Sequence, residues 1–386
     1  MRKKIAVVFN RMIVGGAEKA LLSFLRAIDT ERYDVTLFTL NDKGAYFEEI
    51  PGDITVRFTA CDNAREQFMD DIKHFRVRLI VNGIYCRLMI RLCREPYKKY
   101  SYTLRSYPKL GGHFDCAIAY KINYENTATI LQRIDADKKC IWLHGTIGEP
   151  CETRSWMNQV LSKTQCVFCV SKDWKEQLDH MYPAHRHKTQ VFYNLIPVDE
   201  ILEKSKAPID VSLTNTAIVT VGRLSPEKGQ QMIPQTTRLL LDAGYDVYWY
   251  LVGDGDLRET VESEIQKYDV AEHVILLGTQ MNPYPYIKNC DIYVQTSFSE
   301  GYCTTTMEAK ILRKPIVTTD APGMREQFVS GENGLIVDAM TPEALFEGIR
   351  TLLDHPELRE KFVENLSHEV CDNSGELQKL YDFIES

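Results

Sequence analysis

The chain has 386 residues, of which 44% are hydrophobic and 26% charged, and its formal net charge is −8. This length suffices for two domains that each bury a core, and this composition excludes a wholly disordered chain. No uncharged apolar run approaches the roughly 18 residues of a membrane span, and Asn10 interrupts the short apolar stretch after Lys4, so we expect a cytoplasmic protein without a secretion signal.

The first half of the sequence alternates strand and helix patterns, which is typical of a parallel sheet. Strands are expected at 5–9, 35–40, 55–58, 116–120, 140–144 and 166–170. The helix after the first strand is the clearest, because Leu21, Phe24 and Ile28 belong to one apolar stripe at helical spacing.

Two glycines, Gly15 and Gly16, separate this first strand from its helix. Residues without Cβ let backbone amides approach a phosphate or a sugar, although they can also merely tighten the turn. The loop lacks the lysine of a nucleoside triphosphate-binding P-loop and a full dinucleotide fingerprint.

A basic segment stands out at residues 73–109. It contains ten lysines and arginines against one acid, Glu95, so it carries +9 and the rest of the chain −17. Apolar residues are interleaved with these charges, which is typical of amphipathic helices that lie against anionic lipid. The alternative is a solvated basic face over an ordinary core helix.

His144 ends a strand of otherwise apolar residues, so its imidazole is expected at the domain edge, either as a site residue or as a satisfied core residue. The eleven cysteines are scattered. The one close pair, Cys166 and Cys169, would point to opposite faces of a strand and cannot easily share a metal ion. We therefore expect reduced thiols and no metal site.

The second half repeats the alternation after a polar stretch that follows Pro197. Strands are expected at 217–221, 247–252, 274–277, 291–296, 315–319 and 335–337. We place the domain boundary at 197/198, which predicts an α/β protein with one parallel-sheet domain at 1–197 and another at 198–365.

Glu300 and Glu308 straddle the junction between the strand at 291–297 and a helix that begins near Thr304. Such junctions bind nucleotides, because carboxylates accept hydrogen bonds from hydroxyls and a helix amino terminus favours phosphate. The alternative for Glu308 is a capping box with Thr305, three residues before it.

Arg223 and Lys228 follow the strand at 217–221 and are candidates for holding a diphosphate, since fixed cations stabilise its charge. Their alternative is a surface charge pair with Glu227. Asp254 and Asp256 form an aspartate-x-aspartate pair, but they lie in a glycine turn after a parallel strand, so we reject a metal site there.

Several segments occur in the order and spacing of the retaining glycosyltransferases of family 4. They are residues 221–229, 251–255, 276–278, 300–308 and 331–335, with the glycine loop at 15–18. The sequence resembles this family over nearly its whole length, least so at 61–110.

The resemblance implies the GT-B fold, in which two Rossmann-like domains face each other across a cleft. The first domain would bind the acceptor and the second the donor, and the segment 366–386 would pack back on the first. The implied activity is metal-independent transfer, with retention, of a hexose-type sugar from a nucleoside diphosphate sugar, by preference a UDP-sugar. The acceptor would be a polysaccharide or lipid-linked glycan at the inner face of the cell membrane, where 73–109 meets anionic lipid. No cofactor beyond this co-substrate, no metal and no nucleic acid partner are expected.

The resemblance also suggests residue roles. His144, Arg223, Lys228 and Glu300 would be catalytic, with the two cations on the diphosphate and Glu308 on the ribose hydroxyls. Further donor-binding residues would be Gly15, Gly16, Gly222, Gly278, Thr279, Gly301, Tyr302, Cys303 and Thr304. Family members often have glycine where this chain has Cys303, which does not easily adopt positive φ, so loop shape and sugar selectivity can differ from the family's.

Two alternatives share this architecture. A nucleotide-sugar epimerase would consume the donor without an acceptor, and a degenerate nucleotide-sugar-binding subunit would support a partner transferase. The presence of Arg223, Lys228, Glu300 and Glu308 argues against degeneration.

Overall fold

The computed structural model describes residues 2–9, 12, 15–39, 44, 46–58, 77–93, 96–105, 109–145, 151–211, 213 and 216–386. The chain divides into two compact units, which we call unit 1 (Met1–Tyr193 with Ser374–Ser386) and unit 2 (Asn194–Asn373). Parts of the predicted basic segment, at 73–76, 94–95 and 106–108, lie outside the described residues.

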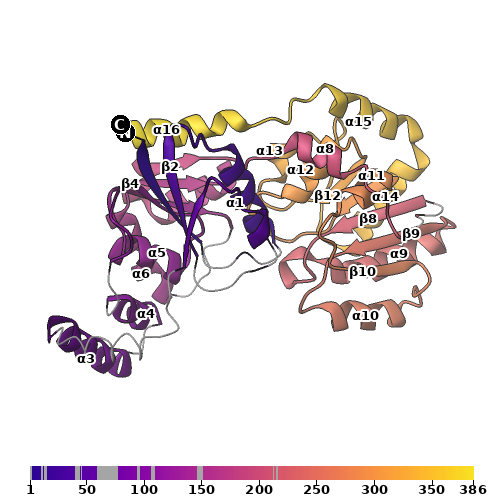
Figure 1. Ribbon diagram of the computed structural model, residues 1–386. Helices are drawn as coiled ribbons and strands as arrows, with labels where there is room; N and C mark the ends of the chain where they lie inside the picture. Colours follow the sequence, from indigo (N-terminus) through magenta and orange to yellow (C-terminus); the bar gives the residue numbers. More distant parts are fainter. Residues whose placement is uncertain are drawn as a thin grey trace. The chain divides into compact units, whose positions relative to one another are not determined.

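Unit 1 is built on a seven-stranded parallel sheet in the order β3-β2-β1-β4-β5-β6-β7 (Figure 1). Its strands are β1 (Lys3–Val8), β2 (Tyr33–Thr39), β3 (Thr55–Phe58), β4 (His113–Ala119), β5 (Asp135–Leu143), β6 (Cys166–Cys169) and β7 (Thr189–Val191). The sequence did not predict β7, because three residues with two polar side chains carry no strand pattern.

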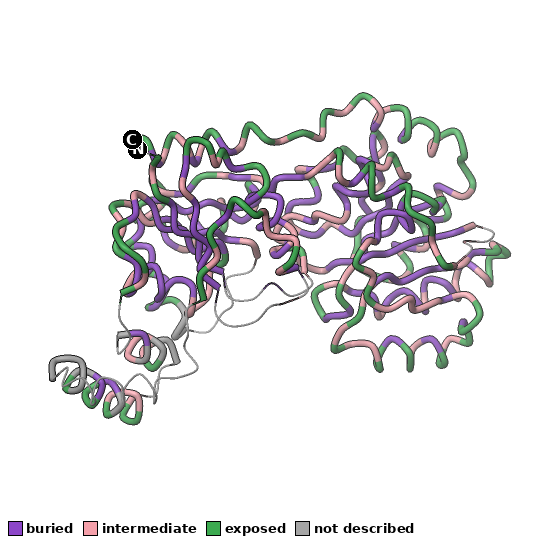
Figure 2. The backbone as a smooth tube through the Cα atoms, viewed as in Figure 1, coloured by how far each residue is buried: buried purple, intermediate pink, exposed green. Residues whose placement is uncertain are grey.

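Helices cover both faces of this sheet, as βαβ connections require. The helices of the unit are α1 (Gly16–Ala27), α3 (Val77–Leu92), α4 (Pro96–Arg105), α5 (Tyr124–Gln132), α6 (Cys151–Lys163), α7 (Lys172–Met181) and α16 (Leu377–Glu385), with 3-10 turns at Phe47–Glu49, Pro183–Lys188 and Ser374–Glu376. Two of them do not lie on the sheet, because α3 packs on α4 and α4 packs on α5. Because both faces are covered, the last four residues of β1, β4 and β5 and all of β6 are continuous apolar runs, and they form the buried centre of the unit in Figure 2.

The last helix, α16, returns to the strands of unit 1. The Tyr381 ring stacks on Tyr33 with ring centroids 5.0 Å apart. The Lys138 ammonium in β5 donates to the Phe383 carbonyl at 2.8 Å and so satisfies a carbonyl at the helix end. The family resemblance implied that 366–386 packs on the first domain. Of this segment, 374–386 with α16 belongs to unit 1, whereas 366–373 belongs to unit 2.

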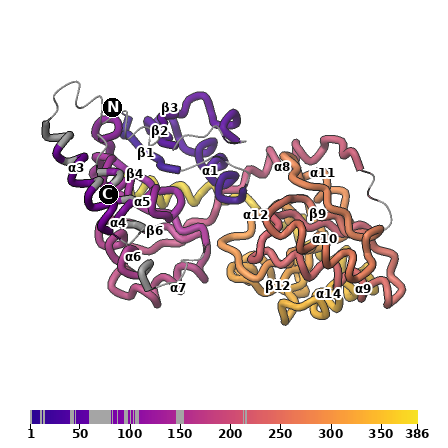
Figure 3. Tube along the Cα trace, turned by 90° about the horizontal axis from the view of Figure 1, so that it is seen from below, coloured from indigo at the N-terminus to yellow at the C-terminus, as the bar shows by residue number. Residues whose placement is uncertain are grey.

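Unit 2 is built on a six-stranded parallel sheet in the order β10-β9-β8-β11-β12-β13. Its strands are β8 (Thr216–Val221), β9 (Val247–Val252), β10 (Val274–Gly278), β11 (Ile292–Gln295), β12 (Ile316–Thr319) and β13 (Leu335–Val337). Its helices are α8 (Val198–Lys204), α9 (Ile233–Asp242), α10 (Arg258–Lys267), α11 (Tyr284–Asn289), α12 (Thr304–Ile311), α13 (Met324–Gln327), α14 (Pro342–Asp354) and α15 (Pro356–His368), with 3-10 turns at Pro226–Lys228 and Gln230–Met232. Helices α9 and α14, which are far apart in the sequence, pack side by side (Figure 3).

Each sheet has one point where the strand order reverses. In unit 1 it lies between β1 and β4, and in unit 2 between β8 and β11. The loops that leave two such strands diverge to opposite faces, and the crevice between them at the carboxyl edge is where open α/β sheets bind ligands. The topology therefore singles out the loops after β1 and β4, and those after β8 and β11. No helix among the described residues is long and apolar enough to cross a membrane.

Candidate active site

The loop after β8 is shaped by glycines that permit close backbone contacts. Gly229 has φ +68°, and a Cβ there would overlap the Thr296 carbonyl oxygen. Gly253, at the end of β9, has φ +143°, and a Cβ there would overlap the carbonyl oxygen of Gly222. Only glycine fits both positions, so the sequence motifs around 222–229 and 251–255 are explained by how tightly these loops pass one another.

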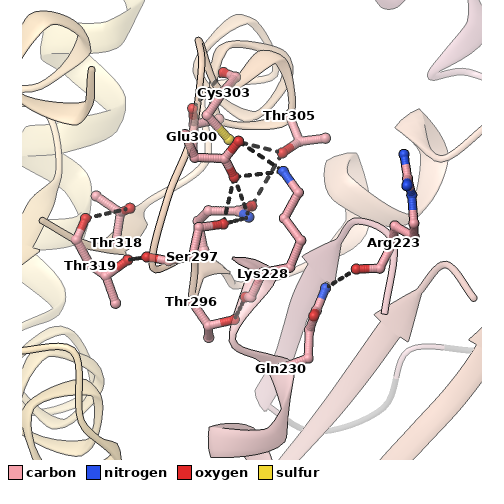
Figure 4. Close-up of polar contacts among 12 residues, drawn as sticks. Arg223, Lys228, Gln230, Thr296, Ser297, Glu300, Cys303, Thr305, Thr318 and Thr319 are labelled. Atoms are coloured by element: carbon pink, nitrogen blue, oxygen red, sulfur yellow. Dashed lines mark hydrogen bonds and ion pairs between the residues drawn. The ribbon is translucent and has the colours of Figure 1, made fainter. Parts of the chain in front are cut away.

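Lys228 and Glu300, from the loops after β8 and β11, form an ion pair at the switch point of unit 2 (Figure 4). The Lys228 Nζ lies 2.7 Å from Glu300 Oε1 and 2.8 Å from Oε2. The Glu300 side chain is 7% exposed and that of Lys228 22%. The sequence alternative that paired Lys228 with Glu227 on the surface is wrong, because the hydrogen-bonding partner is the buried Glu300.

The Glu300 carboxylate accepts hydrogen bonds from side chains at the end of β11 and just after it. The Ser297 hydroxyl and, at 3.4 Å, the Gln295 amide donate to Glu300 Oε1. Gln295 also donates to Ser297 at 2.8 Å and accepts from the Tyr293 hydroxyl at 2.9 Å. Sequence reasoning missed Gln295 and Ser297, although polar residues at the end of an otherwise apolar strand were a signal of this network.

The two loops are also joined through their backbones. The Thr296 hydroxyl donates to the Lys228 carbonyl at 2.7 Å, and the Phe298 amide donates to the Glu227 carbonyl at 2.8 Å. These bonds fix the position of Lys228 relative to β11.

Burial and Coulomb attraction have opposite effects on the protonation of Lys228 in this ion pair. Burial disfavours the ammonium, but the neighbouring Glu300 carboxylate outweighs burial and raises the pKa of Lys228. Burial raises the pKa of the nearby Cys303 thiol to about 11. At neutral pH the site therefore contains a charged lysine beside a neutral thiol.

Helix α12 begins at Thr304, as the sequence predicts. Its start has neither the capping box of Thr305 with Glu308 nor a backbone conformation that would need glycine at Cys303. The N-cap is Cys303 with φ −69° and no side-chain cap bond, so the position needs no glycine. Thr305 lies inside the helix and donates to Gln295 at 3.2 Å, so the capping-box interpretation of Thr305 and Glu308 is wrong. Glu308 is buried, with 3% of its surface exposed.

The remaining predicted donor residues of unit 2 lie on the same carboxyl edge. Arg223 is exposed, and in Figure 4 its side chain does not point toward Lys228. Gly278 ends β10 with φ +68° and is followed by the exposed Thr279. Gly301 and Tyr302, which precede the N-cap, are half-buried. Asp254, from the rejected metal motif, pairs with Arg258 at 3.0 Å.

In unit 1 the predicted glycines lie at the switch point. Gly15 is the N-cap of α1 and Gly16 its first residue. Gly15 has φ 179°, an extended conformation that any residue adopts, and its carbonyl accepts from the Lys19 amide at 3.1 Å. The backbone dihedrals therefore do not demand glycine at position 15.

His144 follows β5, one strand beyond this switch point. Its ring lies on the buried Tyr120 ring, with centroids 4.9 Å apart, and its Nε2 is buried without a hydrogen-bond partner. Burial and the nearby Lys121 charge lower the pKa of His144 to about 3. The imidazole is therefore neutral at physiological pH. One of its ring nitrogens can donate a hydrogen bond and the other can accept one.

The cysteine pair behaves as predicted for buried thiols. Cys166 and Cys169 lie in β6, and burial raises the pKa of each to about 12. Among the residues that the structure describes, no group of three His, Cys, Asp or Glu side chains could hold a metal ion.

A pocket of about 220 Å³ opens in unit 1 among α4, α5 and α6. Tyr102, Tyr124 and Trp156 form its apolar wall, and Lys98 and Lys163 are among its polar lining residues. None of the predicted site residues lines it, and it lies along the sides of helices rather than at a switch point. We therefore do not assign the sugar donor to it.

Residues 203–368 match the family model described as glycosyl transferases group 1. The chain is 24% identical, over 93% of its length and 93% of the relative's, to the N-acetylgalactosamine-N,N'-diacetylbacillosaminyl-diphospho-undecaprenol 4-alpha-N-acetylgalactosaminyltransferase of Campylobacter jejuni. Among solved structures, the fold is similar to that of Alr3699/HepE from Anabaena in complex with UDP, with TM-score 0.70 at 17% identity over the whole of both chains. It is also similar to TarM of S. aureus, with TM-score 0.72 at 11% identity over the whole of both chains.

These matches agree with the two parallel sheets and with the side chains at the switch point of unit 2. The residues that match the family model include Lys228, Glu300 and Glu308, and they lie wholly within unit 2. Residues 203–368 therefore match the glycosyl transferases of group 1, and the chain has the GT-B fold.

Proposed function

We propose that the chain transfers a hexose-type sugar, with retention and without a metal ion, from a UDP-sugar to a hydroxyl of a polysaccharide or lipid-linked glycan. The observation that carries this proposal is the Lys228–Glu300 pair at the switch point of unit 2, within the part of the chain that matches glycosyl transferases group 1. A UDP donor is supported by structurally similar proteins solved with UDP and with UDP-glucose. A lipid-linked acceptor is supported by the Campylobacter jejuni relative, whose acceptor is a diphospho-undecaprenol glycan.

Each residue has a role in this proposal. Lys228 shares its ammonium protons between Glu300 and the donor diphosphate, and Arg223 adds a second cation. Glu300 is fixed beside the sugar by Ser297 and Gln295. Glu308 accepts hydrogen bonds from the ribose hydroxyls, and neutral His144 contacts a sugar hydroxyl.

The proposed step is a front-face displacement. The acceptor oxygen forms a bond to the anomeric carbon on the face from which the diphosphate departs, and the bond between that carbon and the phosphate oxygen breaks. The acceptor proton passes to the departing phosphate, whose charge Lys228 and Arg223 stabilise. Removing one such stabilising group costs roughly 10²–10³-fold in turnover, which is the loss we expect for Arg223→Ala.

The first test is a thermal-shift screen against UDP, GDP, ADP and TDP and their sugar conjugates, with and without a chelator. A ligand at about 100 times its Kd adds about 2.7 kcal/mol of stability. We expect the melting temperature to rise selectively with a uridine compound, also when the chelator is present. A rise only with a nucleotide of another base would overturn the UDP assignment. A shift lost in the chelator would overturn metal independence.

Nucleotide release then separates the transferase from its two alternatives. A transferase releases UDP in proportion to added acceptor, an epimerase converts the donor sugar without acceptor, and a binding subunit does neither. The anomeric configuration of the product, read by NMR, tests retention directly.

A further inference from the structure

Helix α3 carries an unusual exposed apolar face. Val81, Ile84, Tyr85, Leu88 and Leu92 are between 50% and 68% exposed. Their spacing of three, four, seven and eleven residues from Val81 puts them on one side of a 16-residue helix. Of eleven large hydrophobic side chains exposed in the described part of the chain, these five share one helix and the others are scattered, so the face is a patch rather than background.

The rest of unit 1 lies on the other side of this helix. Gly83 and Cys86 are buried. Helix α3 packs on α4 and α4 packs on α5, an arrangement visible in Figures 1 and 3. The Tyr85 and Tyr102 rings meet edge to face at 6.1 Å and join α3 to α4. Because α4 already covers the buried side, the apolar face is the outer surface of the helix.

Charge decides what covers this face. The segment 73–109 carries +9, and within it Arg91 of α3 and Lys99 of α4 are exposed. A second copy of the chain would bring two such segments together and repel. An anionic lipid surface instead offers both an apolar interior and opposite charge.

We propose that α3 lies on an anionic membrane surface, with Val81, Ile84, Tyr85, Leu88 and Leu92 in the boundary between headgroups and acyl chains. The basic side chains at its flank contact lipid phosphates. This inference goes beyond the proposed function and does not depend on the identity of the donor or acceptor.

The test is co-sedimentation with vesicles of phosphatidylcholine alone and of equal parts phosphatidylcholine and phosphatidylglycerol. Wild type is expected to bind only the anionic vesicles, and less at high salt. Ile84→Ser with Leu88→Ser should lower the partition coefficient by about tenfold or more, since two apolar side chains are lost from the lipid. The matched control, Val329→Ser with Val370→Ser in unit 2, also removes two exposed apolar side chains and should leave binding unchanged.

Arg91→Glu with Lys99→Glu tests the electrostatic part and should weaken both binding and its salt dependence. A second measurement uses brominated lipid, which should quench the fluorescence of Leu88→Trp but not that of Leu202→Trp in unit 2, where Leu202 is 42% exposed.

Equal binding to both vesicles, or unchanged binding of Ile84→Ser with Leu88→Ser, would overturn the proposal. The proposal would also be overturned if wild type bound no vesicles but formed a dimer in solution, and if Ile84→Ser with Leu88→Ser dissociated that dimer. A second copy of the chain would then cover the apolar face. The thermal shift with uridine nucleotides does not depend on these outcomes. The membrane proposal can therefore fail while the proposed function is supported, and the proposed function can fail while the membrane proposal is supported.

Discussion

Gly229 and Thr296 approach so closely that no Cβ can be placed between them. The Gly229 backbone, with φ +68°, passes directly against the Thr296 carbonyl at the end of β11. This contact sets the distance between the loop that carries Lys228 and the loop that carries Glu300.

Gly229→Ala should therefore displace Lys228 from Glu300. Backbone strain at positive φ costs about 1–3 kcal/mol, and the overlap with Thr296 adds to it. We expect a lower melting temperature together with weakened UDP binding, measured by thermal denaturation and calorimetry. Gly244→Ala is the matched control, because Gly244 has φ +90° but open space around its Cα. It should lose stability without losing UDP affinity; equal loss of affinity in both variants would contradict the local role of Gly229.

A double-mutant cycle tests the buried ion pair. Lys228→Met leaves the Glu300 carboxylate buried without its cation, which should cost about 3–5 kcal/mol of unfolding free energy. Adding Glu300→Gln removes the orphaned charge and should restore much of the stability, while turnover stays low because the diphosphate has lost one of its two cations. Urea denaturation and an acceptor-dependent UDP-release assay measure the two quantities. Strict additivity of the two stability changes would show that the pair is not coupled.

The proposed ribose contact of Glu308 predicts a specific pattern of affinities. Loss of a hydrogen bond to a charged group costs about 1.5–3 kcal/mol, so Glu308→Gln should weaken uridine, UMP and UDP alike by roughly tenfold to 150-fold. Lys228→Met should weaken UDP but not uridine. Calorimetric titration of both variants with the three ligands reads this pattern, and an unchanged affinity for uridine in Glu308→Gln would place the carboxylate elsewhere.

His144 should make stability depend on acidity. Its pKa is about 3 in the folded protein and 6.5 in an unfolded chain, so between pH 6.5 and about 3 only the unfolded state takes up this proton. Stability should then fall as the pH drops from 6.5 toward 3, by up to about 1.4 kcal/mol per pH unit from this residue.

His144→Gln should lose less stability than wild type over that acidic range, as measured by chemical denaturation at several pH values. Above neutral pH both proteins should respond to pH in the same way, which serves as the internal control. Parallel curves for the two proteins throughout the acidic range would mean that His144 is not held neutral.

The sequence predicted the two parallel sheets and the loops that matter, because apolar runs, glycines and charged residues at strand ends are local signals. It could not show that Lys228 pairs with Glu300, since that contact joins residues 72 positions apart across neighbouring strands. It predicted the start of α12 at Thr304, but the alternative of a capping box between Thr305 and Glu308 is wrong, because Thr305 donates to Gln295 instead. Gln295 and Ser297 were overlooked, because polar residues are common at the ends of strands and only their burial shows that these two support Glu300.

The position of α16 determines the order in which the protein can be completed during synthesis. Unit 2 is one continuous stretch, Asn194–Asn373, whereas unit 1 needs residues 374–386 as well. The ribosome therefore finishes the strands of unit 1 first but delivers the helix that stacks Tyr381 on Tyr33 only after all of unit 2. The unit that is synthesised first is the last to acquire all of its contacts.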